Sequence, residues 1–440
     1  MLNRRSSIAA VAVLALMGPA FAQAPAGKVT VITSFSKDVT DPIKKAFEAA
    51  NPGLTLEVQN RNTNAGVKFV EETKSNNQSD LFWASAPDAF EVLKDKKLLQ
   101  PYKLKAQGIP EKVGAYPIND KDGYYFGFAA SGYGIMWNER YARANKLPEP
   151  KEWQDLAKPA FYDHVSIASP GRSGTTHLTI ETILQGEGWD KGWATIKAMA
   201  GNFNHVAERS FGVPDAVNSG QVGVGIVIDF FAFSAQGAGF PVKFNYPSVT
   251  TVVPANVAIV ANAPNKAGAE TFIEFLISPK GQEVLLDPKI RRLPVNPAIY
   301  AKAPKDFPNP FTDKRFQGMM VFNVDKSGDR TAIVDTLFDQ TISFQLADLK
   351  AITKQLHELD GKLAKKANPK AKALGDEARA LIAAMPVSEA QAAEKDLAAA
   401  FKGKDAKTRR AEYEQKWAAF AKENYAKAKA KVEEALKAAN

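Results

Sequence analysis

Small hydroxyl side chains gather in one short segment that leads into a helical pattern. Residues 169–177 read SPGRSGTTH, and an amphipathic stretch follows them to Gly186. The start of a helix binds anions, because its first backbone N–H groups are free and its dipole is positive at that end. Side-chain donors in the segment come from Arg172, Ser173, Thr175 and Thr176. The segment therefore predicts an anion site, with the alternative that one hydroxyl only caps the helix.

The same segment fits neither of two motifs that would give it another chemistry. A Walker loop has a lysine and a spacing that are missing here. A nucleophile elbow has its second glycine two positions after the serine, whereas Gly174 follows Ser173 directly. The sequence also shows no paired carboxylates, metal-ligand cluster or Ser–His arrangement. We therefore expect no enzyme, and predict no catalytic residue, no metal site and no cofactor.

A second polar segment, residues 202–212, reads NFNHVAERSFG and leads into a short helix from about Pro214. The guanidinium of Arg209 suits pairing with a phosphate or a carboxylate, and Ser210 lies near the predicted helix start. These residues are candidate ligand groups. The alternatives are a surface ion pair for Arg209 and a surface or structural role for His205.

Two further candidates lie where a strand is predicted to end. Asp229 follows the apolar strand 222–227, and a carboxylate there suits the hydroxyl groups of a ligand, with a helix cap as the alternative. Ser34 and Ser36 lie in the first turn from a strand to a helix, where ordinary turn chemistry is the alternative to ligand contact. Strand ends that meet helix starts therefore hold these candidates as well as the earlier ones.

The elements that position these residues follow an α/β pattern. β-Branched residues predict strands at 29–33 and 54–58, and an apolar run predicts a buried strand at 80–84. Between the first two strands, Asp41 and Pro42 predict the start of a helix. Strand, helix and strand in this order imply the crossovers of an α/β lobe.

Two strand-like segments, residues 124–137 and 249–261, are predicted to cross between two such lobes. Lobe one then comprises residues 27–129 and 255–330, and lobe two comprises residues 130–254. A cleft between α/β lobes is a favoured place for a ligand, because strand ends and helix N-termini converge there.

Residues 331–440 change in composition toward Ala, Lys, Glu and Leu, with apolar residues at helical spacing. This pattern predicts a helical extension in at least two pieces, because Pro369 and Pro386 interrupt it. One interpretation is a solvated appendage that packs on one lobe, and the other is a helical hairpin that binds a partner.

The N-terminus and the bulk composition indicate an exported protein. Arg4 and Arg5 precede an apolar run and the small-residue site Ala20-Phe21-Ala22, which predicts a signal peptide at residues 1–22 and a periplasmic location. The 440 residues include no cysteine, which excludes disulfides, thiolate metal sites and a cysteine nucleophile. In an exported chain, the net charge of +9 favours an anionic small ligand or membrane surface over nucleic acid. A monomer is expected.

In the order of several motifs, this chain resembles the extracellular solute-binding proteins of the ferric-iron-binding type. Over about residues 28–330, the chain is most similar to the branch of phosphoglycerate-transport regulatory and hexose-phosphate-binding proteins. The motifs are RSGTTH at 172–177, QGEGWDKGW at 185–193, RSFG at 209–212, and GQVG at 220–223 leading to IDF at 228–230.

The resemblance implies a two-lobed, venus-flytrap fold that closes on a phosphorylated small molecule. It implies that Ser/Thr turns hold the phosphate, that His205 and Asp229 contact the organic part, and that the permease of an ABC importer receives the ligand. A membrane signalling kinase as partner, and ferric iron or an oxyanion as ligand, remain alternatives. Ferric-binding relatives have a tandem tyrosine pair where this chain has Phe230 and Phe231, which have no oxygen for a hard cation.

Overall fold

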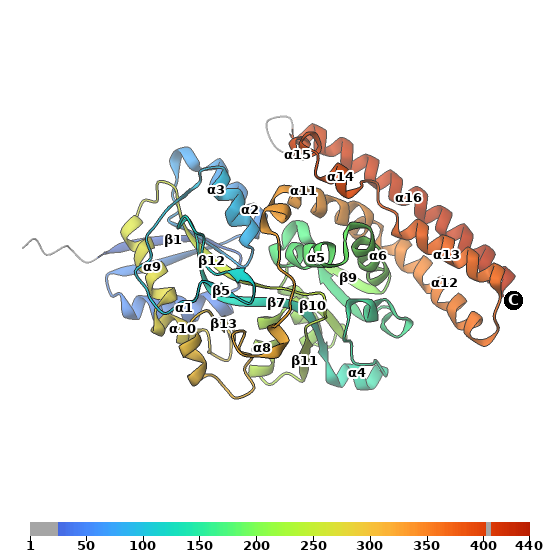
Figure 1. Ribbon diagram of the computed structural model, residues 1–440, viewed down its shortest axis with the longest axis horizontal. Helices are drawn as coiled ribbons and strands as arrows, with labels where there is room; N and C mark the ends of the chain where they lie inside the picture. Colours follow the sequence, from blue (N-terminus) through green and yellow to red (C-terminus); the bar gives the residue numbers. More distant parts are fainter. Residues whose placement is uncertain (1–24, 402–405) are drawn as a thin grey trace, which may run out of the picture.

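The computed structural model describes residues 25–401 and 406–440 (Figure 1). The predicted signal peptide at residues 1–22 lies outside these ranges. Within them, no helix combines the length and the apolar character that crossing a membrane requires.

Lobe one is built from parallel strands with helical crossovers, as the sequence predicts. Strand β1 pairs in parallel with both β2 and β3, and Phe47, Phe82 and Trp83 lie in the core between this sheet and its helices. Its strands are β1 (Gly27–Thr33), β2 (Leu54–Asn60), β3 (Leu81–Ala84), β4 (Leu99–Gln100), β5 (Lys112–Val113), β6 (Tyr116–Pro117) and β13 (Leu293–Pro294). Its helices are α1 (Lys37–Ala50), α2 (Thr63–Glu72), α3 (Pro87–Asp95), α9 (Lys266–Ile277) and α10 (Pro279–Val284).

Two long strands form the centre of the molecule, and they coincide with the two segments predicted to cross between lobes. The first half of β7 (Phe126–Asn138) pairs with β12 (Val252–Val260), and its second half pairs with β10 (Val224–Ile228) and β11 (Val242–Asn245). Strand β7 thus leaves one sheet and enters the next near Gly132. The continuous strand order is β2-β1-β3-β12-β7-β10-β8-β9, in which β8 is Val165–Ala168 and β9 is Phe203–Ala207. The predicted lobe boundaries at 129/130 and 254/255 fall inside β7 and β12.

Lobe two has a smaller sheet with helices on its faces and a core around Trp153 and Trp193. Its strands are β8 (Val165–Ala168), β9 (Phe203–Ala207), β10 (Val224–Ile228) and β11 (Val242–Asn245). Its helices are α4 (Glu139–Asn145), α5 (Gly174–Glu187), α6 (Trp189–Ala200), α7 (Gly212–Asn218) and α8 (Asp229–Gly237).

The first helix begins earlier than the sequence predicts. Helix α1 starts at Lys37 after Ser36, so Asp41 is not its N-cap and Pro42 lies inside it. Val39, Ile43 and Phe47 are buried on one face of this helix, so tertiary packing extends it over the turn before the proline. The prediction of a start at Asp41 is wrong for this reason.

The C-terminal helices form the predicted helical extension and confirm that part of the fold class. They are α11 (Val324–Thr341), α12 (Leu346–Lys365), α13 (Pro369–Ala383), α14 (Glu389–Ala392), α15 (Lys395–Ala400) and α16 (Ala406–Ala438). Pro369 begins α13 and Pro386 follows its end, so the pattern breaks at both prolines. Figure 1 shows α16 lying along α13 and α12 at the end of the molecule away from β1.

Helix α11 connects this extension to both lobes. It packs against α3 of lobe one and α5 of lobe two, as Figure 1 shows near the middle of the molecule. Its buried residues Ile333, Val334 and Leu337 belong to the same core as Trp193 of lobe two and Trp417 of α16. The extension is therefore continuous with lobe two and also reaches lobe one.

Candidate ligand-binding site

The lobes meet where the carboxyl ends of their parallel strands lead into helices. In lobe one these turns follow β1 and β3, and in lobe two they follow β8, β9 and β10. The two lobes come close together at the start of α5. A Cβ built on Gly174 of lobe two would lie 2.8 Å from the Ala86 Cβ and 2.9 Å from the Thr63 Oγ1 of lobe one. Only glycine fits this contact between the lobes without a shift of one of them.

The hydroxyl groups at the start of α5 bond mainly to each other. The Ser173 hydroxyl accepts hydrogen bonds from the Thr176 backbone N–H at 3.1 Å and from the Thr176 hydroxyl at 3.0 Å. Ser173 therefore caps the helix, which is the alternative to its predicted anion role. Thr175 is half-buried, and Arg172 pairs on the surface with Glu208 at 3.1 Å.

Arg209 reaches across the interface between the lobes. Its Nη2 donates to the Asn60 Oδ1 at 3.1 Å, and its guanidinium lies 5.0 Å from the Phe211 ring centre. Burial lowers the pKa of Arg209, and the neighbouring carboxylate of Glu208 opposes this shift. Ser210 is half-buried beside it. The structure thus places a cation at the carboxyl end of β9, against the end of β2.

A cavity of about 540 Å³ lies between the start of α1 and helices α7 and α8. Ser36 lines this cavity from lobe one, and its side chain does not cap α1. Phe211 and Phe231 line it from lobe two. Asp38 and Asp215 also line it, and their repulsion adds to the burial that raises the pKa of Asp215. This part of the interface suits the organic portion of a ligand better than its anionic group.

Asp229 lies at the first residue of α8 and is fully buried. Its carboxylate accepts hydrogen bonds from the Gly132 N–H at 2.7 Å, the Phe230 N–H at 2.7 Å and the Tyr246 hydroxyl at 2.8 Å. Burial raises the pKa of Asp229 to about 6. The carboxylate thus fastens β7 to the start of α8, at the place where β7 changes sheets.

His205 stands apart from these groups. The His205 ring lies 3.2 Å from the Ser166 hydroxyl and 3.0 Å from the Asn204 side chain, both within lobe two. Burial and the charge of Lys350, on α12, lower the pKa of His205. Ser34 is half-buried at the end of β1. The structure therefore brings Ser36 and Arg209 to the interface between the lobes, leaves Ser210 half-buried beside Arg209, and places His205 toward α12.

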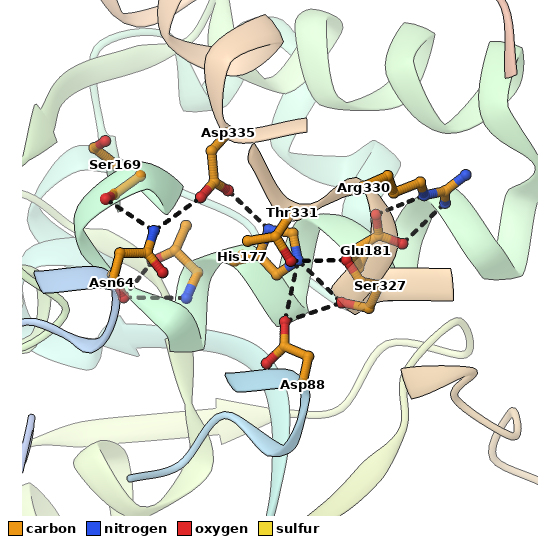
Figure 2. A network of polar contacts seen from close by, with 12 residues as sticks. Asn64, Asp88, Ser169, His177, Glu181, Ser327, Arg330, Thr331 and Asp335 are labelled. Atoms are coloured by element: carbon orange, nitrogen blue, oxygen red, sulfur yellow. Dashed lines mark hydrogen bonds and ion pairs between the residues drawn. The ribbon is translucent and has the colours of Figure 1, made fainter. Parts of the chain in front are cut away.

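A buried network that joins both lobes to α11 was absent from the predicted site residues. The His177 Nδ1 lies 2.7 Å from an oxygen of Asp335, and its Nε2 lies 3.0 Å from the Ser327 hydroxyl and 3.3 Å from Asp88 (Figure 2). Asn64 of lobe one also donates to Asp335, at 3.1 Å. Burial by itself lowers the pKa of His177, but the adjacent carboxylates, Asp335 foremost, raise it to about 9.

A second group missed at the sequence level is Arg292, which precedes β13 and is fully buried between the lobes. No local pattern marks it, because its neighbours come from segments that are distant in the chain. The position of His177 at the end of the hydroxyl-rich motif marks it as a candidate in the sequence. The motif does not identify its partners on α3 and α11, because they come from distant parts of the chain.

Comparisons with known proteins agree with this architecture. Residues 76–316 match the family described as bacterial extracellular solute-binding protein. The phosphoglycerate transport regulatory protein of Salmonella typhimurium is 30% identical over 386 residues, which cover 87% of this chain and 91% of that protein. An iron uptake protein of Synechocystis is 25% identical over 204 residues, 41% of this chain and 54% of that protein.

Solved structures share the fold at low sequence identity. A periplasmic binding protein from Actinobacillus pleuropneumoniae with fructose-6-phosphate bound superposes with a TM-score of 0.64 at 20% identity, covering 72% of this chain and 98% of its own. An iron-bound protein from Pseudomonas aeruginosa superposes with a TM-score of 0.58 at 13% identity, covering 70% and 98%. These neighbours confirm the two-lobed fold, and they are binding proteins rather than enzymes. The chain belongs to the family of bacterial extracellular solute-binding proteins.

Proposed function

We propose that this protein is the periplasmic receptor of an ABC-type importer and captures a phosphorylated small molecule between its lobes. The observation that carries the proposal is a pair of arginines at the interface, Arg209 and Arg292, in a chain of net charge +9. Within the described residues each donates hydrogen bonds only to neutral groups, Arg209 to Asn60 and Arg292 to two serines. Cations without a bound carboxylate favour an anionic ligand.

The names of two similar proteins support a phosphate ester as the ligand class. The relative that aligns with 87% of this chain is named for phosphoglycerate transport, and one structural neighbour holds fructose-6-phosphate. In the proposal, Ser34, Ser36, Thr175 and Ser210 supply hydroxyl donors when the lobes close, and Arg209 supplies charge. Such a receptor would deliver its ligand to a membrane permease.

Ferric iron is the alternative ligand, since iron-binding proteins are also among the neighbours. The rings of Phe230 and Phe231 contact each other at a tilt of 36° with centres 4.4 Å apart, where a tyrosine pair would offer oxygens. In the ranges 25–401 and 406–440, no group of three or more His, Cys, Asp or Glu side chains could hold a metal ion. Both observations favour the phosphorylated ligand over iron.

A sensory role is a second candidate function, because a specific observation favours it. The structural neighbour with fructose-6-phosphate aligns over 98% of its own length but over only 72% of this chain, so more than a quarter of this chain has no counterpart in it. The regulatory relative aligns with 87% of this chain. The part shared with that relative therefore extends into the C-terminal helices. These helices would then present the loaded protein to a membrane sensor.

Isothermal titration calorimetry tests the proposed ligand class. We expect hexose phosphates or phosphoglycerates to bind with a Kd of about 1 μM or lower, near 8 kcal/mol. The unphosphorylated sugars and glycerate serve as controls and should give no heat. Tight binding of ferric citrate with a visible charge-transfer band, together with no heat from any phosphorylated compound, would overturn the proposal.

A further inference from the structure

Arg292 is a buried cation whose faces are covered by aromatic rings. Its side chain is 0% exposed. The guanidinium carbon lies 4.1 Å from the Phe230 ring centre in lobe two and 4.6 Å from the Phe35 ring centre in lobe one. A cation between two rings is held in place by its faces, which leaves its N–H groups free to bond in the plane.

Most of those N–H groups have no acceptor. The Nη2 donates to the Ser85 hydroxyl at 2.6 Å and more weakly to the Ser131 hydroxyl at 3.4 Å. Among the described residues, the Nε and Nη1 have no hydrogen-bond partner. A buried charged donor without an acceptor is costly, since burial removes its water and nothing replaces it. Burial accordingly lowers the pKa of Arg292 to about 9.

The group that would balance this charge within the protein is engaged elsewhere. Asp229 is the carboxylate whose charge acts on Arg292. Its oxygens accept from Gly132, Phe230 and Tyr246 instead, and it forms no ion pair with the guanidinium. Among the described residues, the arginine therefore has no ion pair, and its Nε and Nη1 groups have no acceptor.

A second orphan donor stands on the same strand face. Ser131 and Tyr133 are two residues apart on β7, so their side chains point to the same side of the sheet. Tyr133 is fully buried, and its hydroxyl has no hydrogen-bond partner within the described chain. Tyr133 lies where β7 passes from the sheet of lobe one to that of lobe two.

We propose that Arg292 and Tyr133 bind the anionic group of the ligand at the junction of the two lobes, an inference that rests on the proposed function. A phosphate or carboxylate oxygen would accept from the orphan N–H groups and from the Tyr133 hydroxyl. The arginine touches Ser85 and Phe35 of lobe one and Phe230 of lobe two. Binding there couples the ligand to the relative position of the lobes.

Calorimetry on two variants tests the inference. Tyr133→Phe removes one donor and keeps the ring, so the Kd for the phosphate ester should rise about tenfold to a hundredfold. Arg292→Met removes the charge at similar length and should raise the Kd more than a hundredfold. Tyr425→Phe is the matched control, because it deletes a buried tyrosine hydroxyl that bonds to the Thr341 carbonyl in the C-terminal helices. It should leave the Kd unchanged.

The choice of ligand distinguishes phosphate from carboxylate. Loss of affinity for hexose phosphates, which have no carboxylate, assigns the phosphate to Arg292, and loss for phosphoglycerates alone assigns the carboxylate. Both results support the inference. A folded Arg292→Met protein with the wild-type Kd for both ligands would overturn it, and wild-type binding in the same experiment shows that the proposed function still holds. If the wild type binds no phosphate ester, the proposed function fails and the inference fails with it.

Discussion

His177 lies fully buried between two carboxylates that come from different parts of the chain. Asp88 belongs to α3 of lobe one and Asp335 to α11, while His177 lies in the first turn of α5 of lobe two. The charge of Glu181, one turn further along α5, also raises the pKa of His177. A protonated imidazole therefore neutralises acid groups that would otherwise repel each other at the point where three parts of the protein meet.

The first prediction concerns the pH dependence of this contact. The pKa of His177 rises from 6.5 to about 9 on folding, so its contribution to stability is complete below pH 6.5 and is lost as the pH rises to 9. His177→Gln should lower the free energy of unfolding by about 3 kcal/mol at pH 6.5, and by much less at pH 9. Urea unfolding at several pH values measures this difference.

The control for His177→Gln is Glu423→Gln, which breaks an exposed ion pair on α16. It should leave the free energy of unfolding nearly unchanged at every pH in this window, because an exposed ion pair is screened by solvent. A wild-type advantage over His177→Gln that stays constant from pH 6.5 to 9 would show that the buried imidazole is neutral.

At the scale of elements, the start of α5 contains two kinds of hydroxyl. Ser173 is buried and caps the helix through the Thr176 N–H, so its role in the fold is visible. Thr175 is half-buried, next to the close contact of Gly174 with lobe one. We therefore assign helix capping to Ser173 and propose ligand contact for Thr175 within the same motif.

The second prediction follows from this separation. Ser173→Ala should cost about 1 kcal/mol of folding stability, the usual value of a lost N-cap, with little effect on affinity. Thr175→Ala should instead weaken the binding of a phosphate ester by about 1.5 to 3 kcal/mol. Thermal unfolding and calorimetry on the same two variants measure both quantities. Weaker binding in Ser173→Ala than in Thr175→Ala would mean that the cap serine contacts the ligand.

Local sequence patterns predict those elements whose causes are local. β-Branched runs predicted β1 and β2, and the prolines at 369 and 386 predicted the breaks in the extension. Helix α1 begins earlier than predicted because burial of Val39 outweighs the proline signal. The interlobe groups were less accessible to prediction. Arg292 meets Ser85, which lies 207 residues away in the chain, and no short motif encodes such a contact.

At the scale of the whole molecule, the C-terminal helices are part of the packed core. Trp417 and Tyr425 of α16 are buried in the same cluster as Trp193 of lobe two. The Trp189 indole donates to the Val387 carbonyl at 2.9 Å, which ties α6 to the segment before α14. Lobe two and the extension should therefore unfold together, whereas the candidate ligand groups Arg209 and Arg292 donate to Asn60, Ser85 and Ser131, which lie outside the extension.

The third prediction tests this division of roles. Trp417→Ala should lower the free energy of unfolding by about 3 to 5 kcal/mol, the usual cost of deleting a buried tryptophan. Ligand affinity, measured where the variant is still folded, should change by less than about 1 kcal/mol, because no direct contact is lost. Denaturant unfolding and calorimetry supply the two numbers. A folded variant that no longer binds ligand would show that the extension shapes the cleft.

The most direct measurement for the central claim is mass spectrometry of the small molecule released on denaturing protein that was purified from its native host without added ligand. We predict about one equivalent of a phosphate ester per chain, identified by a phosphate fragment. The amount should fall strongly in Arg292→Met purified in the same way. Stoichiometric ferric iron, or an unphosphorylated solute in place of the ester, would contradict the claim that this protein captures a phosphorylated small molecule.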